Sequence, residues 1–190
     1  MKRIILASSS PRRRQILSSV GIPFEVIVPD VVEEREGNPV ALARRLARRK
    51  ALSVWRKNRK SLVVGADTLV FIDDRVIGKP QDKEEAFKIL SFLSGRWHKV
   101  VTAVCIISQD FKLTLHDIAR VKFRNLCKEE IEAYIESGEP MDKAGAYGIQ
   151  ELGSTIVEEI RGNFYTVMGL PIHRVYPYLK TSKTNSSSSK

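Results

Sequence analysis

The stretch Ile4-Ile5-Leu6-Ala7-Ser8-Ser9-Ser10-Pro11-Arg12-Arg13-Arg14 changes character twice: an apolar run ends at three serines, and a proline then precedes three arginines. This order predicts a strand, a loop and a helix, because Ser10 is a natural N-cap and Pro11 suits the first helical position. Cations in a first helical turn oppose the helix dipole, at about 0.3–1 kcal/mol each. The arginines therefore either bind an anion at this helix end, or are solvated or paired with local carboxylates.

The composition is that of a globular, basic protein. An apolar content of 43% over 190 residues can form a substantial core, and we expect one domain, residues 1–180, followed by a disordered Ser-rich tail, 181–190. Neither a signal peptide nor a membrane span is evident, so a cytoplasmic protein without a membrane partner is predicted. The net charge of +10 attracts polyanions in general. Helix-turn-helix, zinc-finger and RNP patterns are lacking, and no nucleic-acid partner is predicted.

Helix and strand patterns alternate along the chain, which predicts an α/β fold. Strands are expected at residues 3–7, 24–28, 61–66, 69–72, 75–77, 97–107, 113–123, 155–160 and 164–168, and helices at 11–20, from 39 past 54, 83–93, 128–137 and 171–179. In the first helix, Arg13 shares a face with Ile16 and Leu17, so its stem is expected to point inward. Arg14 is expected in solvent.

Asp67 is the most informative single residue. It is expected at the end of a buried strand, 61–66, and open α/β sheets bind ligands at the carboxyl ends of their strands. A carboxylate in this position can be the general base for a water or a ligand of a hard cation such as Mg²⁺. The alternative is a cap or turn aspartate.

Further charged residues lie in separate segments. Lys50 falls on the apolar stripe of the second helix, from which a lysine points inward or extends its stem to solvent. Lys79, between glycine and proline, is in a stiff loop that suits a lysine held against a phosphate. Glu33 and Glu34 form part of an acidic loop that is either solvated or supplies a carboxylate to a Mg²⁺–phosphate site.

The segment 142–150 combines small residues with polar ends, and Gln150 can pair with an amide or a base edge. Cations, carboxylates and an amide together suit phosphoryl or nucleotidyl hydrolysis with a divalent metal. A Ser or Cys catalytic triad cannot be assembled, and the G-x-x-x-x-G-K-[ST] loop of P-loop enzymes is lacking.

Taken together, these motifs resemble the Maf family of nucleoside triphosphate pyrophosphatases. They run from about residue 3 to 179 and are Ala7-Ser8-Ser9-Ser10-Pro11-Arg12-Arg13, Glu33-Glu34, Arg48-Arg49-Lys50-Ala51, Gly65-Ala66-Asp67-Thr68, Gly78-Lys79-Pro80, residues 142–150 and Met168-Gly169-Leu170-Pro171. The resemblance implies an elongated, twisted mixed sheet flanked by helices, with two lobes and a central nucleotide cleft, as in Maf and ITPase-like folds. It also implies a homodimer and a divalent cation, Mg²⁺ or Mn²⁺.

The activity implied by the resemblance is that of a nucleoside triphosphate diphosphatase, a hydrolase that splits the bond between the α and β phosphates. Arg12, Thr68 and Gln150 match the subgroup that acts on dTTP and UTP and are implied to set substrate specificity. One departure is Glu151, where the family usually has glycine.

The same resemblance assigns the remaining roles. It makes Asp67 the proton acceptor, or a ligand of the metal. Glu34 matches the family's acidic loop residue and is the other expected metal ligand. The expected phosphate-binding residues are Ser8, Arg13, Lys50 and Lys79. The alternative function is a nucleotide-binding regulator of cell division without significant turnover, since members of the family have been linked to septum formation.

Overall fold

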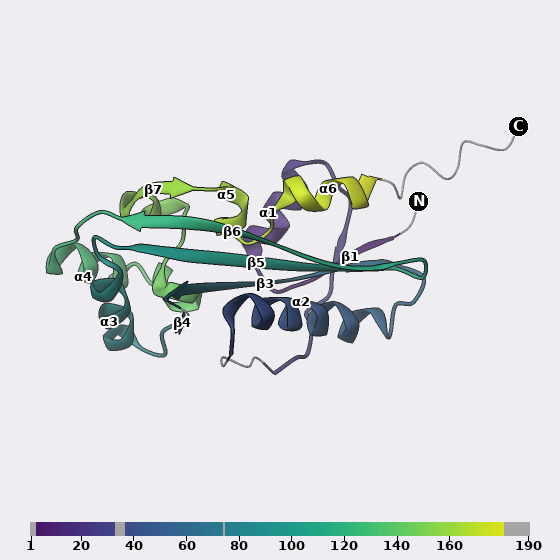
Figure 1. Ribbon diagram of the computed structural model, residues 1–190, viewed down its shortest axis with the longest axis horizontal. Helices are drawn as coiled ribbons and strands as arrows, with labels where there is room; N and C mark the ends of the chain where they lie inside the picture. Colours follow the sequence, from purple (N-terminus) through teal and green to yellow (C-terminus); the bar gives the residue numbers. More distant parts are fainter. Residues whose placement is uncertain (1–2, 33–36, 74, 181–190) are drawn as a thin grey trace, which may run out of the picture.

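A mixed β-sheet runs the length of the molecule, which is elongated along its strands (Figure 1). The computed structural model describes residues 3–32, 37–73 and 75–180. Glu33, Glu34 and the tail 181–190 lie outside the described residues. The strands are β1 (Ile4–Ala7), β2 (Glu25–Val26), β3 (Leu62–Ile72), β4 (Arg75–Ile77), β5 (Trp97–Ile107), β6 (Lys112–Phe123) and β7 (Val157–Arg161).

Within the described residues the sheet has seven strands in the order β2-β1-β3-β5-β6-β7, and β4 pairs with β3. The β1 strand is parallel to β2 and β3, and the other pairs are antiparallel. The helices are α1 (Pro11–Ser19), α2 (Pro39–Trp55), α3 (Lys83–Leu93), α4 (Lys128–Glu136), α5 (Phe164–Met168) and α6 (Ile172–Lys180), with short 3₁₀ turns η1 (Glu139–Asp142), η2 (Ala144–Ala146) and η3 (Glu151–Thr155). The predicted mixed sheet flanked by helices is therefore confirmed.

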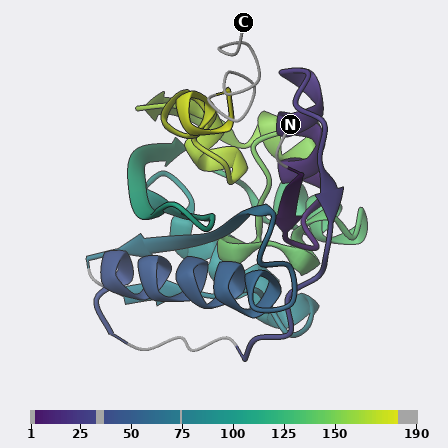
Figure 2. The same cartoon turned by 90° about the vertical axis from the view of Figure 1, so that its right-hand side faces the viewer.

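The two faces of the sheet carry different helices (Figures 1 and 2). Helix α2 covers one face, where its alanines pack on odd-numbered residues of β3 such as Val63 and Phe71. The other face carries the larger core, to which α1, α3, α4 and α6 contribute. Helices α3 and α4 lie at one end of the long strands, away from α1 and α6 (Figure 1). In the described ranges, no helix combines the length and the apolar character needed to cross a membrane.

Local signals explain the helix starts. Helix α1 begins at Pro11 as predicted, although the Ser10 side chain makes no capping hydrogen bond among the described residues. Helix α2 begins after Asn38, whose side-chain oxygen accepts hydrogen bonds from the Val40 and Ala41 N–H groups at 3.1 Å. Such a cap stabilises a helix by about 1 kcal/mol.

Two sequence predictions are wrong. Residues 164–168 were expected as a strand because of their aromatic and β-branched side chains, but they form α5. The Asn163 side chain caps this helix at the Tyr165 N–H, and Gly169 ends it with a φ of 114°. Asp67 does not end a strand: β3 continues from Leu62 to Ile72, because β5 pairs with it almost throughout. The first strand after α1 is also shorter than expected.

Helix α2 approaches β3 most closely at Gly65. A Cβ atom at this position would lie 2.5 Å from the Ala51 nitrogen and 2.7 Å from the Ala47 carbonyl oxygen. Both are backbone atoms, which cannot move out of the way as a flexible side chain could. Gly65 therefore fixes the distance between helix and strand.

We expect Gly65→Ala to lower the free energy of unfolding by about 1–3 kcal/mol, because the added methyl group must push α2 away from the sheet. Urea unfolding followed by circular dichroism measures the change. A variant that unfolds at the wild-type midpoint would contradict the close approach.

Candidate active site

A cavity of about 310 Å³ opens at the carboxyl end of β1. Pairing of β1 with β3 ends at Gly65, and β4 pairs from Val70, so Asp67 and Thr68 lie between the two neighbours. Ligands bind at such strand ends in open α/β sheets, although the strand that ends here is β1 rather than β3. Among the lining residues are the predicted site residues Ser8, Arg12, Arg13, Lys50, Asp67, Thr68 and Lys79.

Lys50 and Asp67 form a buried ion pair in the wall of the cavity. The Lys50 Nζ atom donates to Asp67 Oδ1 at 2.6 Å, and the two side chains are only 11% and 7% exposed. Lys50 thus points inward, as its place on the apolar stripe allowed. Taking two charges out of water is costly, so a buried pair is weak evidence for stability. Its position in a cavity favours a functional role.

Arg13 is held in the wall of the cavity by hydrogen bonds from several sides. Its Nη1 donates to Ser8 Oγ at 3.1 Å, and its Nη2 donates to Thr68 Oγ1 at 3.0 Å. Its Nε donates to the Gly169 carbonyl oxygen at 2.8 Å. The guanidinium is buried, whereas Arg14 is exposed and contacts the Ser9 carbonyl oxygen. The prediction that Arg13 points inward and Arg14 outward is confirmed.

Thr102 does not line the cavity but supports the lining residue Thr68, a role that the sequence did not predict. It lies opposite Thr68 in the β3–β5 pair, and their hydroxyl oxygens are 2.9 Å apart. Its hydroxyl donates to the Thr166 carbonyl oxygen at 2.7 Å, and the Thr166 hydroxyl donates to Asp117 Oδ2 at 2.5 Å. A polar residue inside the apolar run 100–107 was the only signal, and threonine is also an ordinary strand residue.

Two predicted site residues, Lys79 and Gln150, are less buried in the site than Lys50 and Asp67. Lys79 is exposed at the rim, in a loop fixed by a hydrogen bond from the Gly145 N–H to the Gly78 carbonyl oxygen at 2.9 Å. Gln150 does not line the cavity, although neighbouring Ile149 does. The Gln150 amide nitrogen instead donates to the Gln15 side chain on α1 at 3.2 Å.

The described residues fit a cation that arrives with a polyphosphate better than a closed metal site. Among them, no group of three or more His, Cys, Asp or Glu side chains could hold a metal ion. Of the carboxylates that the structure describes, those of Asp67 and Asp142 line the cavity. Mg²⁺ is commonly bound by one or two carboxylates together with substrate phosphates, so this donor set suits it.

Tyr147 forms part of the cavity wall and rests on a buried histidine. The Tyr147 hydroxyl is 2.8 Å from His98 Nε2, and both rings pack edge-on against Phe123. Burial lowers the pKa of His98 to about 4. The imidazole is therefore neutral at physiological pH.

A profile of the family described as Maf-like protein matches residues 3–182 of this sequence. The chain belongs to the Maf family. It is 62% identical over 179 residues to a protein of Aquifex aeolicus named dTTP/UTP pyrophosphatase, covering 94% of each chain. A protein of Symbiobacterium thermophilum with the same name is 48% identical over 181 residues, covering 94% of this chain and 93% of its own.

A solved structure shows the same fold outside close relatives. The Staphylococcus aureus Ham1 protein is 15% identical, with a TM-score of 0.50, and the match covers 96% of this chain and 100% of that protein. The predicted Maf membership and the ITPase-like fold class are thus confirmed.

Glu151, the departure from the usual family glycine, has a left-handed backbone with a φ of 53°. A side chain in this region costs about 1–2 kcal/mol relative to glycine. We expect Glu151→Gly in this Maf protein to raise the free energy of unfolding by about 1 kcal/mol, measured by urea denaturation. Glu151→Ala is the matched control: it removes the charge but keeps Cβ, and an equal gain there would show that charge, not backbone, is responsible.

The buried His98 predicts an acid-sensitive stability. The unfolded chain binds a proton on this residue near pH 6.5, whereas the folded chain resists it until about pH 4. The free energy of unfolding therefore does not depend on this residue above pH 6.5. It decreases by about 3 kcal/mol as the pH falls from 6.5 toward 4. We expect His98→Gln to reduce this pH dependence in urea unfolding between pH 6.5 and 4, and parallel wild-type and variant profiles would contradict it.

Proposed function

We propose that this Maf protein hydrolyses dTTP and UTP to the nucleoside monophosphate and pyrophosphate, the activity for which its relatives are named. The observation that carries the proposal is the Lys50–Asp67 pair, which lies in one cavity with Arg13 and Lys79. Among the described lining residues, the cations Arg12, Arg13, Lys50 and Lys79 outnumber the carboxylates Asp67 and Asp142. Such a cavity favours a polyanionic ligand.

The phosphates are proposed to bind between the two sides of the cavity. Ser8 and Arg13 follow β1, Lys50 extends from α2, and Lys79 lies at the rim. Charged donors at fixed positions stabilise the negative charge that develops on the leaving pyrophosphate. A cavity of about 310 Å³ is at the lower end of the range for small-ligand sites.

Asp67 is proposed to act on the attacking water. The carboxylate takes a proton from a water molecule, the water oxygen bonds to the α phosphorus, and the bond to the bridging oxygen of the β phosphate breaks. Lys50, at 2.6 Å, orients this carboxylate. Asp67 could instead be a metal ligand, the alternative role that the sequence leaves open.

Mg²⁺ or Mn²⁺ is proposed as the cofactor, with Glu34 as a protein ligand and with Asp67 as a second ligand in its alternative role. When bound, a divalent cation neutralises phosphate oxygens and polarises the phosphoryl group. The position of the Asp67 carboxylate at the cavity supports its part of this proposal, while Glu34 lies outside the described residues.

Base selection is proposed for Arg12, Thr68 and Gln150. Thr68 is held by Arg13 and Thr102, which fixes its hydroxyl at the cavity. A purine would be disfavoured mainly by size.

We further propose that residues 1–180 form a single domain and that the protein is a cytoplasmic homodimer. The proposed cellular purpose is house-cleaning, the removal of modified pyrimidine nucleotides.

The test is product analysis with a panel of nucleoside triphosphates and Mg²⁺ or Mn²⁺. We expect pyrophosphate rather than orthophosphate from dTTP and UTP, and no turnover after chelation of the metal. Asp67→Asn is expected to lose most of the turnover, by about 10²-fold or more, while still binding dTTP in calorimetry.

Asp110→Asn, in the β5–β6 turn, is the matched control and should retain full activity. Normal turnover by Asp67→Asn would contradict the catalytic role of this residue. Tight dTTP binding by the wild type without turnover would instead favour the nucleotide-binding regulator, and orthophosphate release would contradict the proposed bond cleavage.

A further inference from the structure

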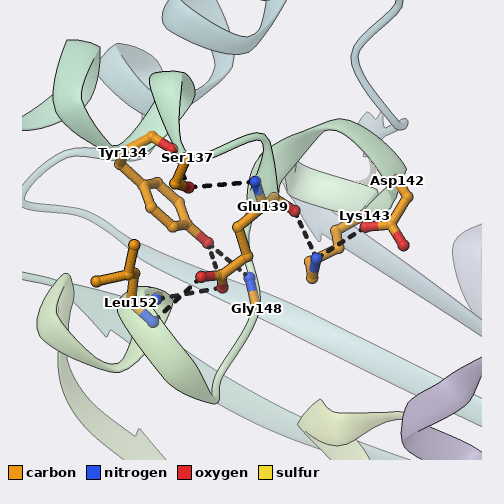
Figure 3. Close-up of polar contacts among 8 residues, drawn as sticks. Tyr134, Ser137, Glu139, Asp142, Lys143, Gly148 and Leu152 are labelled. Atoms are coloured by element: carbon orange, nitrogen blue, oxygen red, sulfur yellow. Dashed lines mark hydrogen bonds and ion pairs between the residues drawn. The ribbon is translucent and has the colours of Figure 1, made fainter.

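The Glu139 carboxylate binds one end of segment 148–153 (Figure 3). Its Oε2 accepts a hydrogen bond from the Leu152 N–H at 3.1 Å, and its Oε1 accepts one from the Gly153 N–H at 3.2 Å. Backbone donors are costly to leave unsatisfied when they are removed from water. The half-buried Glu139 side chain therefore replaces water for one end of the segment.

Tyr134 on α4 extends the same connection to the other end of the segment. Its hydroxyl donates to Glu139 Oε1 at 2.9 Å and accepts a hydrogen bond from the Gly148 N–H at 3.1 Å. Burial raises the pKa of Tyr134, so the hydroxyl keeps its proton at neutral pH. Gly148 and Gly153 are thus both bound to the Tyr134–Glu139 pair.

The glycines show how tightly this connection is packed. A Cβ atom on Gly148 would lie 2.9 Å from Glu139 Oε1. A Cβ atom on Gly153 would lie 2.2 Å from the Gly148 carbonyl oxygen and 2.8 Å from the Tyr134 hydroxyl. The two ends of the segment therefore touch, and the residues between them form a closed loop whose position depends on the pair.

This closed loop faces the proposed nucleotide site. Ile149 lines the cavity, and Gln150 contacts Gln15 on α1. A second connection leads from Glu139 to the cavity, because Lys143 Nζ donates both to the Glu139 carbonyl oxygen and to Asp142 Oδ1, at 2.5 and 2.8 Å. Segment 148–153 and the lining residue Asp142 are thus both connected to Glu139, the first through its side chain and the second through its backbone.

We propose that Glu139, together with Tyr134, is a positioning residue for base selection. The pair holds Ile149 in the cavity wall and the adjacent Gln150 against Gln15 on α1, without touching the nucleotide itself. This inference rests on the proposed pyrimidine nucleotide activity, and neither residue is given a part in the chemical step.

Glu139→Gln is the sharpest test because it keeps the size of the side chain but leaves one oxygen for three donors: the Tyr134 hydroxyl and the N–H groups of Leu152 and Gly153. The new NH₂ group must face at least one of them. We expect the KM for dTTP to rise about ten-fold, the effect of losing one hydrogen bond, with kcat nearly unchanged. We also expect the preference for dTTP over GTP to fall.

Glu136→Gln is the matched control. It makes the same chemical change three residues earlier, at an exposed side chain that pairs with Lys83 at 2.8 Å, and should leave KM and base preference unchanged. Tyr134→Phe removes the hydroxyl but keeps the ring, and should raise KM in the same way. Because both variants break one connected unit, the double variant should be less impaired than the sum of the single effects.

Two further measurements separate this inference from the proposed function. Calorimetric Kd values for dTTP and GTP report base selection even if the wild type hydrolyses neither, an outcome that would overturn the activity alone. Amide hydrogen exchange should accelerate at Gly148, Leu152 and Gly153 in Glu139→Gln. A variant that loses thermal stability but keeps wild-type KM, Kd and base preference would overturn the positioning role.

Discussion

The close approach of α2 to β3 at Gly65 is the constraint on which the charged centre depends. Ala51 lies against this glycine, and Lys50 precedes Ala51 on the same helix. On the strand, Gly65 and Asp67 are two residues apart and share a face. The Lys50–Asp67 distance of 2.6 Å therefore follows from backbone packing. A buried ion pair seldom stabilises a fold. The close packing of α2 on β3 therefore holds Lys50 and Asp67 together in a place where hydrophobic burial alone would not favour two charges.

On one side of β3, pairing with β1 ends at Gly65 and pairing with β4 begins at Val70. The gap between these two neighbours also shapes the site. Neighbouring residues of a strand point to opposite faces of a sheet, so Asp67 meets α2 while Thr68 meets Arg13 and Thr102 on the other side. Inside a continuous sheet these side chains would be separated by the sheet itself. Here the partner strands stop short, and both side chains line one cavity. One strand thus supplies the proposed catalytic carboxylate and a proposed specificity residue.

What the sequence could predict depended on how local the cause was. The inward position of Arg13 follows from helical periodicity and was predicted, whereas the same periodicity placed Lys50 on the apolar stripe but left both its directions open. The continuity of β3 past Asp67 depends on pairing with β5, about 30 residues away along the chain, and was not predicted. Helix α5 was missed because its aromatic and β-branched residues favour strands, while the Asn163 and Gly169 caps prevail. The contact of Gln150 with Gln15 joins residues 135 positions apart, a distance that no local pattern covers.

The residues that were predicted and those that were missed differ physically. Arg13 in a first helical turn and Lys50 on an apolar stripe each conflict with a local preference, and such conflicts point to functional sites. Glu139 conflicts with none, because a glutamate at the start of a 3₁₀ turn in a polar loop is ordinary. Its importance appears only when its carboxylate is seen to accept hydrogen bonds from Tyr134, Leu152 and Gly153. Sequence reasoning therefore finds groups that are costly without a ligand, whereas groups that hold the cavity wall in place become visible only through their contacts.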